Sequence, residues 1–167
     1  MIRSARTLPA LASLALLVAL SGCGLRPLYS NGSSGAAAKS LAGGRGDPIE
    51  GKAGWLMQNN LNDRLSAMGK GEPRYTLKVQ LNDRIEGLGI RADDSVTRER
   101  RTLRARFQLV DTADDSTVLD ETAAWDAGID VVSSEYATVA AEDTALERLS
   151  QIVADRVISR IAAKTDK

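Results

Sequence analysis

The sequence has no histidine, a single cysteine and few aromatic residues, which make up 4% of its 167 residues. Without histidine the chain cannot build Ser-His-Asp or Cys-His nucleophilic machinery. A lone thiol also excludes cysteine-rich zinc sites and a disulfide within the chain. A carboxylate pair for glycoside hydrolysis remains formally possible, but so few aromatic side chains leave little platform for a sugar. Because a Gly-rich phosphate loop is missing as well, we expect no catalysis, no metal and no cofactor.

An excess of positive charge is missing too, since 22 Lys and Arg balance 22 Asp and Glu. A nearly neutral chain gives no basis for bulk binding to nucleic acid, which depends on cations that neutralise phosphates. Any electrostatic function must therefore come from how the charges are arranged on the folded surface.

The single cysteine, Cys23, follows a segment with the build of a secretory signal peptide. Arg3 and Arg6 form a cationic start, and the apolar run PALASLALLVAL (residues 9–20) comes next. A membrane-spanning helix needs about twenty apolar residues, so this run is too short to span comfortably. The motif LSGC (residues 20–23) resembles the lipobox of bacterial lipoproteins, in which the thiol receives a diacylglyceryl group and cleavage precedes the cysteine. A buried structural cysteine or an unpaired thiol fits this position less well.

Lipidation of Cys23 would anchor the chain to a membrane. Each buried methylene contributes about 0.8 kcal/mol and stable anchoring takes two chains or more, a threshold that a triacylated cysteine exceeds. The next residue is Gly24, whereas an aspartate there favours retention in the inner membrane. We therefore expect a lipoprotein of the outer membrane that faces the periplasm. Cleavage would remove Arg3 and Arg6 and no acid, leaving 20 cations against 22 acids and a net charge of −2.

Composition divides the chain into three expected parts. Residues 1–22 form the signal peptide, residues 23–44 the lipidated N-terminus and a flexible tether, and residues 45–164 the folded domain. Gly, Ser and Ala dominate residues 30–46, as in flexible linkers. A tether of this length spans roughly 20–25 Å on average. We expect a short first strand near Arg45–Glu50.

Two segments have the periodicity of amphipathic helices, with apolar residues three and four apart. The first, Trp55–Met68, ends before Gly69, where a C-cap glycine belongs. The second, Tyr136–Lys164, contains no proline or glycine. The expected core-facing residues are Met57, Leu61, Leu65 and Met68 in the first helix, and Val139, Leu146, Leu149, Val153, Val157 and Ile161 in the second.

Between these helices the apolar period changes to two, which predicts strands with one buried face. We expect strands over Tyr75–Ile85, Val96–Val110 and Val118–Val131, the first of them ended by Gly87 and Gly89. The expected inner residues are Leu103, Ala105, Phe107 and Leu109 in the second strand, and Leu119, Ala123, Trp125, Ala127, Ile129 and Val131 in the third. Glu121 shares the face of the third strand but interrupts its apolar pattern near the strand start, where we expect access to water.

Helices must cover the apolar face of such a sheet, while its polar face stays free. The sequence therefore predicts an α+β fold, a two-layer sandwich in which two helices pack on one face of an about four-stranded sheet.

Four arginines share the polar face of the second strand, namely Arg98, Arg100, Arg104 and Arg106. Guanidinium groups bind phosphate through paired hydrogen bonds, so this arginine row suits a polyanion. Alternatively, the row is a solvated face that pairs across strands with Asp120, Asp126 and Asp130, at about 0.2–1 kcal/mol for each pair. Such pairing would neutralise the patch, and the residue pattern alone favours it.

Several segments, taken in order, resemble the LptE family of lipopolysaccharide-assembly lipoproteins in its alphaproteobacterial form. They are the lipobox followed by GLRPLY (Gly24–Tyr29), the stretch IEGKAGWLMQNNLNDRL (Ile49–Leu65), the three strands, and SSEYATVAAEDTALERLSQIVADRVISRI (Ser133–Ile161). The resemblance covers essentially the whole mature chain, and the ordered set carries it rather than any one motif.

This resemblance implies a sandwich of two helices and four strands that plugs the lumen of the outer-membrane β-barrel LptD and helps that barrel assemble. The complex inserts lipopolysaccharide into the outer leaflet. In the family, basic residues before the second long strand and near the start of the last helix are implicated in contact with the phosphorylated lipid. The first of these positions falls on Arg91, whereas the second has Ala140, Ala141 and Glu142 and no cation. The arginine row is then expected to contact lipopolysaccharide phosphates or the barrel wall.

A second function fits the same sequence features. Similar small α+β lipoproteins serve as auxiliary subunits of periplasmic lipid-transport systems that an ABC transporter drives. The two functions differ in partner, which is an outer-membrane barrel in the first and an inner-membrane transporter or a lipid-shuttling complex in the second.

Overall fold

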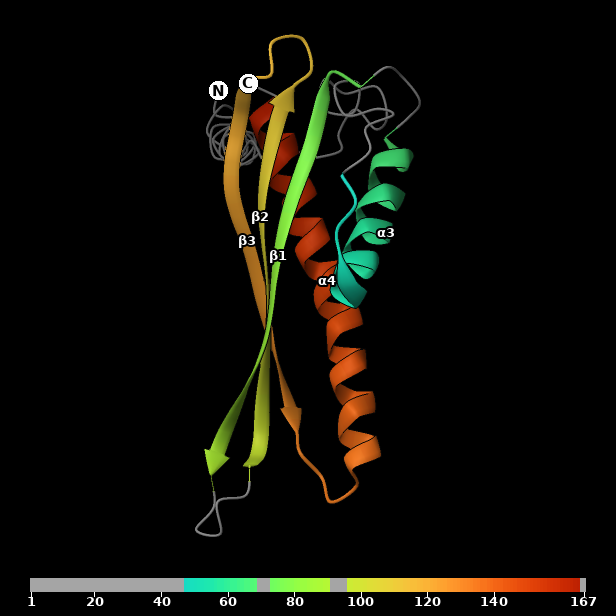
Figure 1. Cartoon of the computed structure of the whole chain (residues 1–167), viewed down its shortest axis with the longest axis vertical. Helices are drawn as coiled ribbons and strands as arrows, with labels where there is room; N and C mark the ends of the chain where they lie inside the picture. Colours follow the sequence, from blue (N-terminus) through green and yellow to red (C-terminus); the bar gives the residue numbers. More distant parts are fainter. Residues whose placement is uncertain (1–46, 69–72, 91–95, 166–167) are drawn as a thin grey trace, which may run out of the picture. The chain divides into compact units, whose positions relative to one another are not determined.

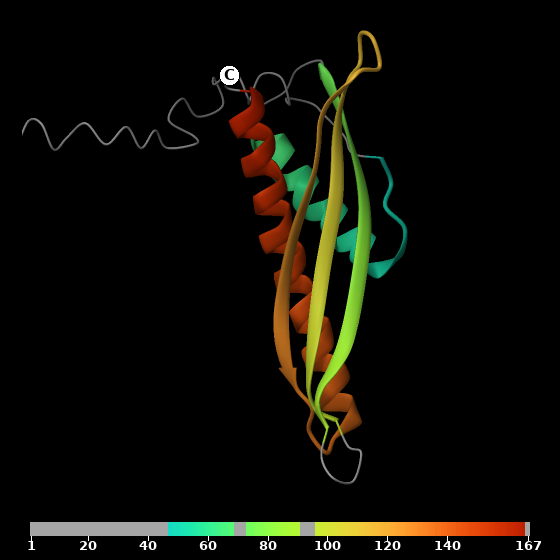
Figure 2. The same ribbon diagram turned by 90° about the vertical axis from the view of Figure 1, so that its left-hand side faces the viewer.

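The computed structural model describes residues 47–68, 73–90 and 96–165. Five elements follow one another there: helix α3 (Gly51–Ala67), strand β1 (Tyr75–Ile90), strand β2 (Val96–Asp111), strand β3 (Thr117–Asp130) and helix α4 (Glu135–Thr165). The strands form an antiparallel sheet in the order β1-β2-β3. Both helices lie on the same face of this sheet (Figures 1 and 2). The predicted two-layer α+β arrangement is therefore confirmed.

A fourth strand is not found in the part of the chain that the structure describes. The sequence predicts one near Arg45–Glu50, but the residues from Asp47 onward there have no regular secondary structure. The N–H of Asp47 donates to the carbonyl of Leu77 at 3.4 Å. The Gln58 side chain, rather than a strand ladder, holds the next residues, since its Oε1 accepts the N–H of Ile49 at 3.3 Å.

Strand β1 is longer than the sequence predicts. Its expected end lies at Gly87, but its pairing with β2 continues past both glycines to Ile90, which lies opposite Val96. Glycine weakens a strand because it lacks a side chain to pack, yet it keeps both backbone hydrogen-bonding groups. Backbone pairing with β2 therefore keeps β1 in the strand conformation beyond Gly87 and Gly89.

Strand β2 is the central strand and contributes alternate residues to the core. Leu103, Ala105, Phe107 and Leu109 are fully buried, as the sequence predicts. The helices cover them with Met57, Leu61 and Leu65 from α3 and with Leu146, Leu149, Val153, Val157 and Ile161 from α4. One hydrophobic core thus joins both layers.

Helices α3 and α4 run in the same direction and are joined by an ion pair near each end of α3. Lys52 Nζ lies 2.6 Å from Asp143 Oδ1. Arg64 Nε lies 2.5 Å from Asp155 Oδ1. Because α3 begins beside Asp143, the earlier turns of α4 have no neighbouring helix in the described structure.

The first turns of α4 differ from the predicted apolar stripe for this reason. Val139 was expected in the core but is 50% exposed, so that prediction is wrong. Thr138 is buried instead. Its hydroxyl accepts the N–H of Val132 at 3.4 Å and lies at the same distance from the carbonyl of Ser134. Polar contacts with the loop before the helix therefore favour the burial of Thr138 over that of Val139.

Helix α3 packs closely on the segment that precedes it. Gly54 is buried, and a Cβ atom there would overlap the backbone carbonyl of Ile49. A backbone obstacle cannot swing away as a flexible side chain can, so this contact requires glycine.

We predict that Gly54→Ala lowers the free energy of unfolding by about 1–3 kcal/mol, as overpacking does. In an open helix the same change stabilises by about 1 kcal/mol, because alanine has the higher helix propensity. Urea denaturation measures the difference, with Asn59→Ala at an exposed site of the same helix as the control. A gain in stability for Gly54→Ala would contradict the close contact.

Candidate functional site

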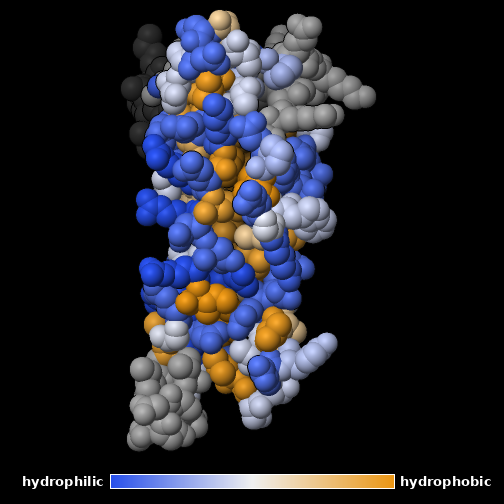
Figure 3. All heavy atoms as spheres, in the orientation of Figure 1, coloured by the Kyte–Doolittle hydropathy of each residue, from blue (hydrophilic) through white to orange (hydrophobic). Residues whose placement is uncertain are grey.

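The sheet face opposite the helices is polar, and all four predicted arginines lie on it. Arg98, Arg100, Arg104 and Arg106 are exposed and alternate along β2 with the buried core residues. Figure 3 shows hydrophilic side chains along the sheet side and hydrophobic ones between the strands and the helices. The predicted arginine row is therefore a real surface feature.

Two of these arginines form loose ion pairs with the neighbouring strand. Arg98 Nε lies 3.4 Å from Asp130 Oδ1, and Arg100 Nε lies 3.9 Å from Asp126 Oδ2. All four side chains are at least half exposed, so water and salt screen both pairs. These contacts follow the cross-strand pairing that the solvated-face interpretation predicts.

Arg106 forms the tightest pair of the row. Its Nε and Nη2 donate to the two carboxylate oxygens of Asp120 at 3.0 and 2.7 Å. Gln108 Nε2 donates to the same carboxylate at 2.8 Å. The hydrogen bonds from Arg106 and then Gln108 lower the pKa of Asp120 to about 2. Because Asp120 accepts hydrogen bonds from both Nε and Nη2, this edge of the Arg106 guanidinium is not available to another anion.

Arg104 differs from its neighbours because no acidic side chain pairs with it among the described residues. The register places Asn82 of β1 and Ala124 of β3 beside it. Within the three strands this face carries six cations and four acids: Lys78, Arg84, Arg98, Arg100, Arg104 and Arg106 against Glu86, Asp120, Asp126 and Asp130. The face therefore keeps a small excess of positive charge, with Arg104 at its centre.

Two other predicted site residues, the lipidation residue Cys23 and Arg91, lie outside the described residues. Within the described ranges no group of three or more His, Cys, Asp or Glu is placed to hold a metal ion. Neither α3 nor α4 is long and apolar enough to cross a membrane.

Sequence reasoning missed Arg101, which lies on the inner face and is buried. Its Nε and Nη2 donate to the Asp83 carboxylate of β1 at 2.9 and 2.5 Å. Its Nη1 donates to the backbone carbonyl of Glu142 in α4 at 2.8 Å. The hydrogen bonds to Asp83 raise the pKa of Arg101 further. Strand periodicity could have indicated this position, because Arg101 lies two residues before the buried Leu103 and therefore points to the same face of β2.

Glu99 adds a second polar group to the same inner face. Its Oε2 is buried and has no hydrogen-bond partner among the described residues. Burial, and then the charge and side-chain hydrogen bond of Glu142, raise the pKa of Glu99. Near this end of the sheet, polar groups therefore face α4 beside the buried Ile129.

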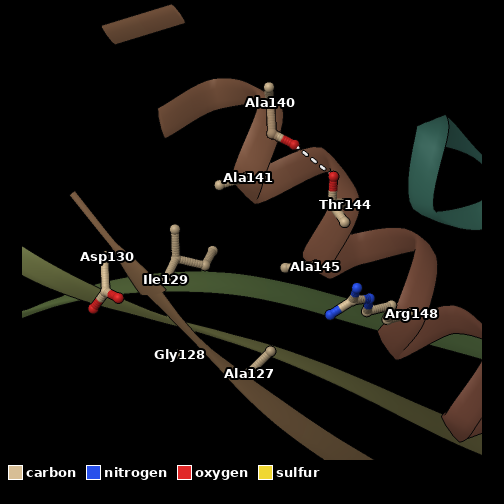
Figure 4. Close-up of a pocket in the computed structure, with 9 residues that line it drawn as sticks. All are labelled: Ala127, Gly128, Ile129, Asp130, Ala140, Ala141, Thr144, Ala145 and Arg148. Atoms are coloured by element: carbon tan, nitrogen blue, oxygen red, sulfur yellow. Dashed lines mark hydrogen bonds between the residues drawn. The ribbon is translucent and has the colours of Figure 1, made fainter. Parts of the chain in front are cut away.

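Beside the free edge of β3 lies a cleft of about 520 Å³ (Figure 4). Ala127, Gly128, Ile129 and Asp130 line it from the strand, and Ala140, Ala141, Thr144, Ala145 and Arg148 line it from α4. Arg148 extends from the helix toward the strand (Figure 4). Nothing in the sequence pattern alone places these two segments side by side.

One family model matches this chain over residues 40–161, which is well over half of its length. Its description is LptE: lipopolysaccharide-assembly. A comparison with curated proteins finds no match.

Three solved lipoprotein structures have a similar fold. A candidate lipoprotein from Caulobacter crescentus CB15 is 20% identical, with a TM-score of 0.61 over 82% of this chain and 97% of that one. A minor lipoprotein from Acinetobacter baumannii is 14% identical, with a TM-score of 0.58 over 72% and 90% of the two chains. The rare lipoprotein B of Shewanella oneidensis is 10% identical, with a TM-score of 0.55 over 72% and 92%. At these identities the likeness concerns the fold alone.

We predict that Arg101→Leu lowers the free energy of unfolding by about 1–3 kcal/mol, because it removes the hydrogen bonds to the Asp83 carboxylate and the Glu142 carbonyl. Urea denaturation measures this loss. The double variant Arg101→Leu with Asp83→Leu should recover much of it, because both charges are then gone. Arg104→Leu, at an exposed position of the same strand, should change stability by less than about 0.5 kcal/mol. Equal losses at Arg101 and Arg104 would show that the inner ion pair has no special role.

A second prediction concerns acid titration of Asp120. Its pKa of about 2 in the folded state lies below the ordinary value of about 3.9. The contribution of the carboxylate to stability is therefore present above the unfolded-state pKa and is lost as the pH falls through about 2. Carboxyl NMR should show this low midpoint, and Arg106→Gln should move it up toward the ordinary value. A midpoint that Arg106→Gln leaves in place would assign the shift to another cause.

Proposed function

The chain belongs to the LptE family of lipopolysaccharide-assembly proteins, and on that premise we propose that it plugs the outer-membrane barrel LptD and helps that barrel assemble. The family match over residues 40–161 is the observation that carries the proposal. The family consists of non-enzymatic lipoproteins, in agreement with a sequence that contains no histidine. Recognition of partners is then the work of this protein.

The polar sheet face supports a role inside a barrel. The interior of an outer-membrane barrel is polar, and in some barrels an inserted domain or loop fills it. A sheet with helices on one face only presents its other face to such a wall without exposing an apolar surface. The central strand β2 is paired on both edges, so the arginine row is held on a rigid support.

The uneven pairing of the arginine row supports the proposed contact with lipopolysaccharide. Arg106 is occupied by Asp120, whereas Arg100 is held only at 3.9 Å and Arg104 has no acidic partner among the described residues. Guanidinium groups that are free or loosely paired can bind a phosphate through two hydrogen bonds. We assign Arg104 and Arg100 to the lipid phosphates, together with Arg91 at the loop that the resemblance indicates.

The lipid anchor completes the proposal. Acylation of Cys23 would hold the N-terminus in the periplasmic leaflet of the outer membrane, with Gly24 as the sorting residue. Residues 30–46 would then let the domain reach a barrel about 20–25 Å away. Mass spectrometry of the native N-terminus tests this step directly, since an unmodified sulfur at Cys23 would exclude the anchor.

The main experiment is affinity purification of the lipidated full chain from native membranes, with partners identified by mass. We expect LptD to co-purify and its folded amount in the outer membrane to fall when this chain is depleted. Recovery of an inner-membrane ABC transporter in place of LptD would exclude the plug and support the auxiliary lipid-transport subunit.

We predict that Arg100→Glu together with Arg104→Glu weakens binding to lipopolysaccharide at least about tenfold, or about 1.4 kcal/mol. Both side chains are exposed, so thermal unfolding should change little. The control is Arg148→Glu with Lys164→Glu, which makes the same change in net charge at two exposed positions of α4. Binding is measured at low and moderate salt, because an electrostatic contact weakens as salt rises. Equal effects of the two double variants would leave only net charge as the cause.

A further inference from the structure

Among the described residues, strand β3 has a neighbour on one edge only, and the register shows which groups face outward on the other. The N–H of Val131, just after β3, donates to the carbonyl of Thr97 in β2 at 3.1 Å. The N–H and C=O groups of the odd-numbered residues of β3 therefore point toward β2. The carbonyl of Thr122 accepts from Arg160 of α4, so it points away from β2. Backbone groups alternate in direction along a strand. The outward set therefore continues through Ala124, Asp126 and Gly128.

These outward groups have no hydrogen-bond partner in the described structure beyond the carbonyl of Thr122. Natural edge strands are usually blunted by proline, lysine, a bulge or short length. Strand β3 is 14 residues long and contains neither proline nor lysine. Its only register shift, at Leu109 and Val110 of β2, lies at the far end of the strand. The stretch from Ala124 to Gly128 is thus a regular and open edge.

The side chains near this edge do little to repel another strand. Asp126 and Asp130 project from the outer face, where Arg100 and Arg98 partly neutralise them. Gly128 carries no side chain, and a Cβ there would meet only the Arg98 side chain. Charge and bulk, two common protections of an edge strand, are therefore weak here.

The cleft next to the edge would receive the inner-facing side chains of an added strand. Its lining from α4 is mostly small, with Ala140, Ala141 and Ala145. Arg148 extends from α4 toward the strand (Figure 4) and forms no ion pair with any described residue. Along the same edge Trp125 is 43% exposed, and the Arg156 guanidinium lies 3.9 Å from the centre of its ring. Tryptophan and arginine are enriched among the residues that dominate binding energy at interfaces.

We propose that the edge of β3 from Ala124 to Gly128 accepts an added β-strand from a partner protein. The strand would carry small apolar residues toward the cleft and one carboxylate that pairs with Arg148. Main-chain hydrogen bonds supply affinity in this mode of recognition, and pockets for alternate side chains supply specificity. Identification of LptD as the donor rests on the proposed function, whereas the strand pairing itself does not.

An acyl chain fits this cleft less well than a strand. It would remove the N–H and C=O groups of three edge residues from water without replacing their hydrogen bonds, which is costly. A strand satisfies the same groups. The chemistry of the edge therefore favours a peptide over a lipid.

The test places a photo-crosslinking amino acid at position 126 of the lipidated full chain in cells and identifies the crosslinked peptide by mass. Ala124→Pro removes one outward N–H and no ladder bond to β2, so the fold should persist, as proline is tolerated on edge strands. Its matched control, Ala124→Val, keeps the N–H. We expect the crosslink to map to one extended peptide segment, to fall at least about tenfold with proline and to stay within about twofold with valine.

Circular dichroism and thermal unfolding check that the proline variant is folded. Should it not fold, Ala141→Trp fills the cleft from α4 and leaves the sequence of the strand unchanged, and it should lower the crosslink to a similar extent. A crosslink to lipid alone, or yields that neither substitution lowers, would overturn the inference.

Recovery of LptD by affinity purification is scored separately. If LptD is recovered but no proline-sensitive crosslink forms, the strand site is wrong and the plug stands. If a proline-sensitive crosslink maps to a different protein and LptD is not recovered, the strand site stands and the plug falls.

Discussion

Strand β2 has hydrogen-bonded neighbours on both edges and helices on only one of its faces. Because successive side chains point to opposite faces, a shift of register by one residue would move its arginines into the core and its core residues into water. Unpaired burial of even one guanidinium is costly. Phe107 and its inner neighbours are fully buried while Arg104 and Arg106 are exposed, so the two faces specify the same register. The position of every charge on the sheet depends on that register.

Arg101 shows what an exception to the alternation requires. It lies on the same face of β2 as the buried residues, and its guanidinium donates hydrogen bonds to the Asp83 carboxylate and the Glu142 carbonyl. These contacts join β1, β2 and α4 near one end of the sheet, where α3 no longer covers the strands. Polar contacts there add to the burial of Ile129, whereas the apolar cluster fills the space between the layers elsewhere. The same end carries Glu99, whose raised pKa reflects burial and the nearby Glu142.

The free surfaces of the molecule have different chemistry. The sheet face is charged, largely self-paired and slightly positive, which suits a polar wall or a phosphorylated lipid. The edge of β3 offers unpaired backbone groups next to a cleft lined mostly by small residues, which suits a peptide strand. On the proposed function, one small domain would recognise lipid at the sheet face and a protein strand at the edge of β3.

The α+β class, the two helices, the three long strands and the exposed arginine row follow from the sequence alone, because the direction of a side chain depends on local helical or strand periodicity. The family resemblance also came from the sequence. Other features required the tertiary structure. They include the absence of a fourth strand from the described residues and the continuation of β1 through Gly87. They also include the burial of Thr138 in place of Val139 and the partners of Arg101, which lie 18 and 41 residues away. The same holds for Arg104, which lacks an acidic partner because the register sets Asn82 and Ala124 beside it. Which groups meet across strands and helices is decided by the packing of the whole domain, and no local pattern in the chain contains that information.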